Sequence, residues 1–322
     1  MDTISHTNDL HVVFGTGPLG TWTARALLEQ GLRVRMVNRS GHAPHAPAGV
    51  EVVRGDAYDV ASTTALARGA AAVYQCAQPA YHQWEGNFPR MQAAILEGAA
   101  CSGARLVVGE NLYIYGDPQG QPLTEQSPYR AHTRKGRIRQ AMTEALFAAH
   151  RAGRLPVASA RASDFFGPYD SISTGLVYGP ALAGKTLKLI GRLDQPHTFS
   201  YVADFGRALA ILGTRAEGLG RAWHVPSPAP LTQAELAALI GEEAGRPVRA
   251  RGSGRAVLWL LGRFNPAVAE TVEMLYEWER PFVMDSSAFT STFGMQPTPL
   301  REAVRASLDW ARTPEGLAAA HA

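Results

Sequence analysis

Cysteine is scarce in this chain. Its 322 residues include only two, Cys76 and Cys101, which is too few for a disulfide framework. The sequence also shows no spacing of cysteine and histidine typical of a metal site, so we expect no bound metal. Disulfides persist in oxidising compartments, and their scarcity favours a protein of the reducing cytoplasm.

Long apolar runs and concentrated charge are missing as well. No apolar stretch reaches the roughly 18 residues that a transmembrane helix needs, and residues 1–9 lack the apolar core of a signal peptide. The formal net charge is only +3, and the basic residues are spread along the chain, unlike a nucleic-acid surface. We therefore expect a small-molecule substrate, with neither a membrane nor a nucleic acid as partner.

The most informative segment is residues 10–31. Residues 11–14 are apolar and predict a buried strand, and residues 21–30 have the apolar face of a helix. Between them stand Gly15, Thr16, Gly17, Pro18, Leu19 and Gly20. A strand, a glycine turn and a helix in this order predict a dinucleotide site, in which the helix N-terminus binds the pyrophosphate. A glycine turn without a ligand is the alternative interpretation.

A carboxylate is absent where a site for NAD would have one. About 20 residues after the glycines, the predicted strand 32–38 ends in Asn38, Arg39 and Ser40. A carboxylate would repel a 2′-phosphate, whereas arginine can pair with it. We therefore expect NADP rather than NAD as the cofactor, although Arg39 could also be a plain surface residue.

Further cofactor contacts are expected at the ends of the next strands. Asp56 follows the predicted strand 50–53 and could cap the next helix or reach the adenine. Ala77 and Gln78 follow the predicted strand 70–76. In a doubly wound sheet, ligands bind at this carboxyl edge.

Alternating strands and helices predict an α/β fold, with a doubly wound parallel sheet of the Rossmann type. We expect a dinucleotide-binding domain over residues 8–168, to which residues 197–215 return, and a smaller α/β substrate lobe over most of 169–322. Asp204 and Thr232 are predicted helix N-caps. An aromatic stripe in 271–279 is typical of a core or of a contact between subunits, which leaves a homodimer open.

Several further motifs follow in a fixed order. They are Gly55-Asp56, Tyr115-Gly116, Phe166-Gly167-Pro168, and the segments 197–204 and 285–300. Together with the glycine turn they cover nearly the whole chain, which resembles the extended short-chain dehydrogenase/reductase family, the NAD(P)-dependent epimerase/dehydratase group. The resemblance implies an oxidoreductase or epimerase/dehydratase-type enzyme that binds NADP and acts on a small polar carbonyl or alcohol.

The catalytic motif of that family is not matched. The family has serine or threonine four residues before the Tyr-Gly pair, where this chain has Asn111. Its Tyr-x-x-x-Lys pair falls on Gly136 and Gln140, or on Ala131 and Lys135 in another register, so the tyrosine is missing either way. In the first register, the helix face towards the site would present Thr133, Gly136, Arg137 and Gln140, with free space at Gly136.

Tyr113 could replace the missing tyrosine, with help from other polar residues. Tyr113 is the candidate acid, Lys135 or Arg137 would lower its pKa, and Asn111 would donate a hydrogen bond to a substrate oxygen. Tyr113 could instead be a packing residue. The basic run 134–139 could be a solvated helix start or could bind an anionic ligand. Two other functions stay open: a non-redox cyclase, lyase or isomerase that uses the same cleft, and a regulatory protein that senses NADP.

Overall fold

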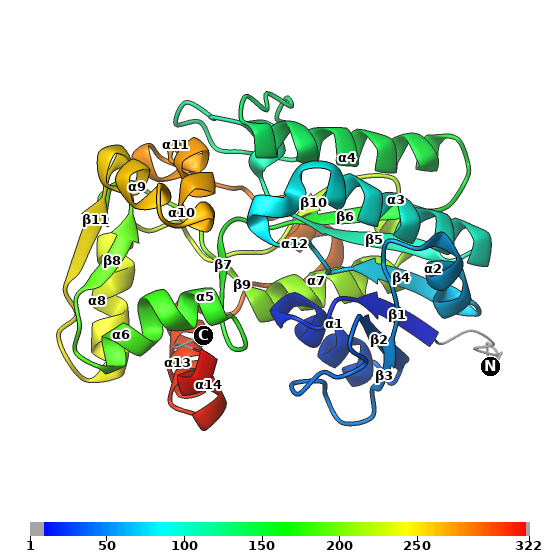
Figure 1. Cartoon of the computed structure of the whole chain (residues 1–322), viewed down its shortest axis with the longest axis horizontal. Helices are drawn as coiled ribbons and strands as arrows, with labels where there is room; N and C mark the ends of the chain where they lie inside the picture. Colours follow the sequence, from blue (N-terminus) through cyan, green and yellow to red (C-terminus); the bar gives the residue numbers. More distant parts are fainter. Residues whose placement is uncertain (1–9, 320–322) are drawn as a thin grey trace.

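The computed structural model describes residues 10–319 (Figure 1). The predictions for residues 1–9 and the outer domain limits at 8 and 322 lie outside this range. A seven-stranded parallel sheet has the order β10-β6-β5-β4-β1-β2-β3. Its strands are β1 (Leu10–Phe14), β2 (Arg33–Asn38), β3 (Glu51–Arg54), β4 (Ala70–Gln75), β5 (Arg105–Glu110), β6 (Val157–Arg161) and β10 (Ala222–His224).

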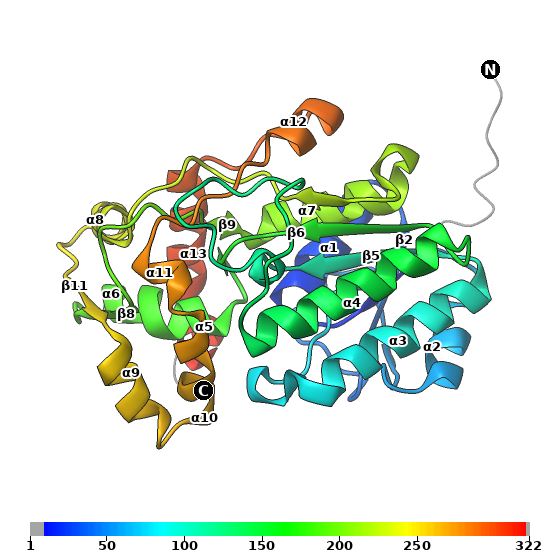
Figure 2. The ribbon, with the colours of Figure 1, turned by 90° about the horizontal axis from the view of Figure 1, so that it is seen from above.

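Helices cover both faces of this sheet (Figures 1 and 2). One face carries α2 (Val60–Ala67), α3 (Trp84–Ser102) and α4 (Arg134–Arg151), and the other carries α1 (Pro18–Glu29) and α7 (Val202–Thr214). All five residues of β1 and of β6 are buried, as expected for parallel strands between two helical layers. The predicted α/β fold with a doubly wound parallel sheet is thus confirmed.

A smaller lobe lies beside the carboxyl edge of the sheet (Figure 1). It contains the parallel pairs β8 (Leu187–Ile190) with β11 (Ala250–Ser253) and β7 (Phe165–Phe166) with β9 (Ser200–Tyr201). Its helices and helical turns are α5 (Ser171–Ser173), η3 (Thr174–Tyr178), α6 (Gly179–Leu182), α8 (Gln233–Ala244), α9 (Arg255–Gly262), α10 (Pro266–Thr271), η5 (Val272–Met274), α11 (Tyr276–Glu279), α13 (Leu300–Ala311) and α14 (Pro314–Ala319).

The chain returns to the main sheet beyond the expected segment 197–215. After η4 (Ala216–Gly218), β10 pairs with β6 and adds an edge strand. Trp223 of β10 packs edge-on against Phe289 of α12 (Ser287–Phe293). The aromatic stripe 271–279 is partly internal, since Met274 and Tyr276 are buried with Phe282. This part of the stripe belongs to the core of one molecule.

The predicted N-cap residues are found at the start of only some helices. Thr232 forms a capping box with Glu235 at the start of α8, as expected. Asp204 is not a cap, because α7 already begins at Val202 and the buried Asp204 carboxylate accepts the backbone amide of Thr298 at 2.7 Å. Asp59 rather than Asp56 caps α2.

Residues 257–264, most of them apolar, form the greater part of α9 (Arg255–Gly262) and the turn after it, and most of their large apolar side chains are exposed although Leu258 is buried. Trp259 is 58% and Phe264 84% accessible to solvent. Within the described residues, every helix is too short or too polar to cross a bilayer.

Candidate functional site

The main cleft lies at the carboxyl ends of β1, β4, β5 and β6. It has a volume of about 510 Å³, and its wall includes residues of the glycine turn, the β4 and β5 ends and the second lobe. The order of strands reverses between β1 and β4. Such a switch point is where ligands bind in doubly wound sheets.

The glycine turn has the geometry of a pyrophosphate cradle. Gly15 has a φ of +112°, and a Cβ there would lie 2.7 Å from the Ala77 amide nitrogen. A Cβ on Gly20 would lie 2.0 Å from the Gly15 carbonyl oxygen, whereas one on Gly17 would meet nothing within 4 Å. Gly17 is the N-cap of α1, without a side-chain cap or an acidic residue in the first turn. Its first amides can therefore serve an anion.

The loop after β2 is ordered by Asn38. The Asn38 side-chain amide donates to Thr16 Oγ1 and to the His42 carbonyl, both at 2.8 Å. Its oxygen accepts the amides of Ser40 and Gly41 at 3.1 and 2.7 Å. Asn38 thus connects the loop to the glycine turn, while Arg39 next to it is exposed.

The end of β4 contributes backbone and small side chains. Cys76, Ala77 and Gln78 line the cleft. Burial raises the pKa of Cys76 to about 12, so its thiol stays protonated. Asp56 is exposed, and its carboxylate accepts the Tyr58 amide at 2.9 Å within its own turn.

Tyr113 begins the turn η2 (Tyr113–Tyr115) and contributes to the cleft wall with Asn111. Tyr81, in the turn η1 (Tyr81–Gln83), donates its hydroxyl to the Tyr113 hydroxyl at 3.2 Å. Asn111 accepts the Tyr113 backbone amide with its side-chain oxygen at 3.4 Å, which leaves its NH₂ group to face other partners. Tyr113 therefore keeps its own hydroxyl proton for a further acceptor.

The expected lowering of the Tyr113 pKa is wrong. Burial raises the pKa of Tyr113 well above its usual value, and Tyr81, Glu277 and Asp164 add to the effect. Lys135 is not among the groups that shift the pKa of Tyr113, because its ammonium group contacts the Tyr81 carbonyl and the Glu270 carboxylate instead. At neutral pH, Tyr113 is a proton donor rather than a phenolate.

Helix α4 turns a different face to the cleft than expected. Arg137 is exposed, and Gln140 donates to Glu144 at 2.8 Å on the outer side. Gly136 leaves no free space, because a Cβ there would lie 2.7 Å from the Tyr113 carbonyl oxygen. Lys135 and Arg139, four residues apart, are the buried cations instead.

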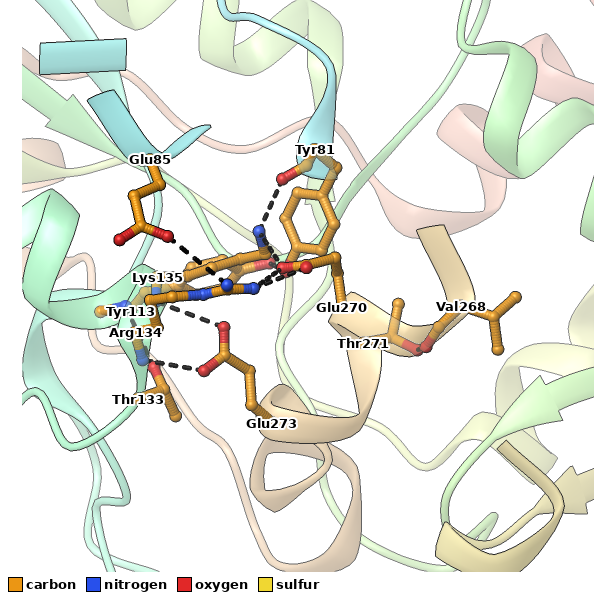
Figure 3. Close-up of polar contacts among 11 residues, drawn as sticks. Tyr81, Glu85, Tyr113, Thr133, Arg134, Lys135, Val268, Glu270, Thr271 and Glu273 are labelled. Carbon is orange, nitrogen blue, oxygen red and sulfur yellow. Dashed lines mark hydrogen bonds and ion pairs between the residues drawn. The ribbon is translucent and has the colours of Figure 1, made fainter. Parts of the chain in front are cut away.

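Lys135 joins the two lobes (Figure 3). Its ammonium group donates to the Tyr81 carbonyl at 2.6 Å, pairs with Glu270 of α10 at 2.7 Å and lies 4.0 Å from the centre of the Tyr81 ring. Glu273 of η5 accepts the backbone amides of Arg134 and Lys135 at 2.8 and 3.3 Å. Lys135 is thus placed to position Tyr81, which in turn contacts Tyr113.

Two carboxyl groups, those of Asp164 and Glu277, also line the cleft. Glu277 of α11 is buried, and its Oε1 atom has no hydrogen-bond partner in the described part of the chain. Burial raises the pKa of Glu277 well above its usual value, helped by the negative charge of Asp164. Asp164 itself pairs with His197 at 2.9 Å. His197 is 1% exposed and stacks on Trp278, so it is a structural residue here.

The sequence did not single out Glu277 or Asp164 as site residues, and it indicated Arg139 only as a part of the basic run 134–139. The i, i+4 spacing of Lys135 and Arg139 was a visible signal within the basic run. No comparable signal joins Glu277 to Asp164, because folding alone brings these distant segments together. Within residues 10–319, no group of three or more histidine, cysteine, aspartate or glutamate side chains could hold a metal ion.

Comparisons with known proteins agree with this architecture. The model of the NAD dependent epimerase/dehydratase family matches residues 12–225. An uncharacterised protein of Sinorhizobium fredii, y4nL, is 22% identical over 314 residues, 90% of this chain and 86% of that protein.

Two solved structures are similar over almost their whole length. One is a UDP-glucose 4-epimerase of Thermus thermophilus in complex with NAD, which is 20% identical with a TM-score of 0.76 over 95% of this chain and 99% of that one. The other is the dTDP-glucose 4,6-dehydratase DesIV of Streptomyces venezuelae with NAD and TYD bound, 19% identical with a TM-score of 0.76 over 96% and 98%. At these identities the likeness establishes the fold.

Proposed function

The chain belongs to the NAD dependent epimerase/dehydratase family, and from this premise we propose that it is an NADP-dependent oxidoreductase that reduces a small polar carbonyl substrate. The nicotinamide, when bound, supplies the hydride for such a reaction. The side chains around the cleft supply binding and the proton.

The cofactor would be held by the segments that line its side of the cleft. Residues Gly15 to Gly20 offer the pyrophosphate a backbone cradle, and Ala77 and Gln78 line the cleft beside it. Asn38, Arg39 and Ser40 would surround the adenosine ribose, and Arg39 would pair with a 2′-phosphate. Asp56, at the end of β3, would lie on the adenine side.

One observation carries the assignment of reduction: the Tyr81 hydroxyl donates to the Tyr113 hydroxyl. Tyr113 then has its own proton directed elsewhere, and its raised pKa keeps that proton in place at neutral pH. An alkoxide that forms on the substrate is more basic than a phenolate, so Tyr113 can protonate it. Asn111 would donate its free NH₂ group to the same oxygen.

Asp164 and Glu277 support a second candidate, an epimerase-, lyase- or isomerase-type reaction that moves a proton. A carboxyl group whose pKa is raised by burial can act as an acid beside a second carboxyl group that acts as a base. Here burial raises the pKa of Glu277, and Asp164 pairs with His197. Product formation without a change in NADPH absorbance would favour this candidate over reduction.

The substitution Tyr113→Phe tests the proposal. Positioned proton transfer contributes about 10²–10⁴-fold to a rate, so turnover of NADPH with a panel of carbonyl compounds should fall by roughly that factor. Asn111→Ala should cost less, about the 0.5–1.5 kcal/mol of one hydrogen bond.

A control separates catalysis from packing. Tyr178→Phe removes another buried hydroxyl, in the second lobe, and should leave turnover near that of the wild type. If Tyr113→Phe retains wild-type turnover, Tyr113 is not the acid.

A further inference from the structure

Arg139 is a buried cation that forms no ion pair with any carboxylate of the described residues 10–319. It lies on α4 one turn after Lys135 and is 5% exposed. Its guanidinium carbon lies 5.0 Å from the centre of the Trp84 ring and 4.4 Å from that of Phe88, both on α3. The side chain lines the main cleft together with Tyr113 and Asn111.

Two of the three guanidinium nitrogens of Arg139 are unused as donors. Its Nε and Nη1 atoms are buried, and neither has a hydrogen-bond partner among the residues that the structure describes. A second buried arginine shows the contrast. Arg161 donates to Glu110 at 3.0 Å, to Tyr115 at 2.7 Å and to Tyr129 at 2.9 Å. Arg161 is therefore satisfied within the fold, and Arg139 is not.

The Glu110 carboxylate cannot neutralise both Arg139 and Arg161. One oxygen of Glu110 accepts from Thr143 at 2.5 Å, and the other accepts from Ser159 and Arg161 at 2.9 and 3.0 Å. Arg139, Arg161 and Glu110 thus carry one surplus positive charge. Burial lowers the pKa of Arg139 to about 10, which still leaves it charged at neutral pH. An unpaired charge of this kind is costly to bury.

We infer that Arg139 binds an anionic group, a carboxylate or a phosphate, carried by the substrate next to its reacting carbonyl. A guanidinium offers parallel N–H groups that match the two oxygens of such a group. The faces of Trp84 and Phe88 hold the guanidinium in place, so little freedom is lost on binding. This inference rests on the proposed reduction and narrows its substrate class to anionic carbonyl compounds.

Binding of non-reacting probes tests the inference without turnover. Oxamate presents a carboxylate beside a carbonyl, and oxamide is its neutral counterpart. We expect oxamate, with or without NADPH, to bind the wild-type protein at least tenfold more tightly than oxamide in calorimetric titrations. Inorganic phosphate, titrated in parallel, shows whether the site prefers a phosphate to a carboxylate.

Substitutions at Arg139 identify the residue responsible. Arg139→Met and Arg139→Gln should weaken oxamate or phosphate binding at least tenfold, since a hydrogen bond to a charged group is worth about 1.5–3 kcal/mol. Arg139→Lys should retain part of the affinity. Arg137→Met, an exposed arginine of the same helix, should have no effect.

Thermal stability without ligand separates a binding role from a structural one. If Arg139 serves a ligand, Arg139→Met should raise the Tm of the ligand-free protein, because an unpaired buried charge is removed. A structural arginine would give a lower Tm.

Three results overturn the inference. They are a wild-type protein that binds neither anion, oxamate affinity unchanged in Arg139→Met, and loss of NADPH rather than oxamate affinity in that variant. The proposed reduction fails separately, if no carbonyl compound oxidises NADPH while oxamate still binds through Arg139.

Discussion

Arg39 is the residue on which the choice of cofactor depends. The side chain of Asn38 is engaged with its own loop and with Thr16 of the glycine turn, so it shapes the site rather than selecting the nucleotide. Arg39 is exposed beside it and is free to pair with a 2′-phosphate. No acidic side chain occupies either position, and a ribose without the phosphate would gain less there.

Arg39→Ala should therefore reduce the preference for NADPH over NADH. A charge-assisted hydrogen bond is worth about 1.5–3 kcal/mol, which corresponds to roughly tenfold or more in affinity. Fluorescence titration of both nucleotides measures the ratio. Arg33→Ala, at the opposite end of β2, should leave it unchanged, and an unaltered ratio in Arg39→Ala would refute the role of Arg39.

Glu277 makes the stability of the protein depend on pH. Burial raises its pKa well above the unfolded value, which is about 4.3. A group with a raised pKa in the folded state stabilises the protein fully below the unfolded pKa, and this stabilisation is lost as the pH rises towards the folded pKa. The folded protein must either keep the Glu277 carboxyl group protonated or bury its negative charge.

Glu277→Gln should remove this dependence. Between pH 5 and 8, about the window above the unfolded pKa, the Tm of the variant should increasingly exceed that of the wild type. Glu279→Gln, a partly exposed carboxyl on the same helix, should follow the wild-type curve. Parallel curves for Glu277→Gln and the wild type would show that Glu277 is ionised in the fold.

At the scale of elements, two glycines of the turn between β1 and α1 have different roles, one in folding and one in binding. Gly20 is needed for folding, since a Cβ there would overlap the Gly15 carbonyl oxygen at 2.0 Å. Gly17 has a φ of −76° and open space at its Cβ position. Packing within the protein therefore does not require a glycine at position 17, and only a ligand that approaches the turn from solvent would need one.

Gly17→Val should thus abolish nucleotide binding in a protein that still folds, because the side chain would occupy the approach of the pyrophosphate. Gly20→Val should instead fail to fold or be clearly less stable, because overpacking a buried site costs about 1–3 kcal/mol and occasionally more. Circular dichroism and nucleotide titration distinguish the two effects. Normal NADPH affinity in folded Gly17→Val would mean that the nucleotide binds elsewhere.

The elements that could be predicted are those with a local signal. The strand, glycine turn and helix at residues 10–29 follow from their own residues, and so does the capping box at Thr232. The cleft-facing side of α4 could not be predicted from a family motif. Packing against Trp84 and Phe88 of α3 turns Arg139 inward, and this packing depends on distant parts of the chain.

At the scale of the whole molecule, the side of the cleft that contains Tyr81 and Tyr113 is supported by contacts between the two lobes. Glu270 and Glu273 of the second lobe hold the start of α4, and Glu270 balances the charge of Lys135 (Figure 3). Lys135 is only 2% exposed, and its ammonium group lies 2.7 Å from the Glu270 carboxylate. The same ammonium group holds the Tyr81 carbonyl, and the Tyr81 hydroxyl donates to Tyr113.

Glu270→Gln should consequently affect both stability and activity. Removing one partner of a buried ion pair costs about 3–5 kcal/mol, and the side chain of Glu270 is 15% exposed, so we expect a loss near the lower limit in urea unfolding. Turnover should fall while the NADPH affinity stays constant, because Tyr81 loses its support and the glycine turn does not.

A double-mutant cycle with Lys135→Met checks the origin of this effect. The double variant should recover part of the lost stability, since no unpaired ammonium group remains, and the coupling energy should be about 0.5–3 kcal/mol. Glu97→Gln breaks an exposed pair with Arg154 and should change stability by about 0.5 kcal/mol or less. Additive effects of Glu270→Gln and Lys135→Met would mean that the two side chains do not act as a pair, and that Lys135 does not position Tyr81 through Glu270.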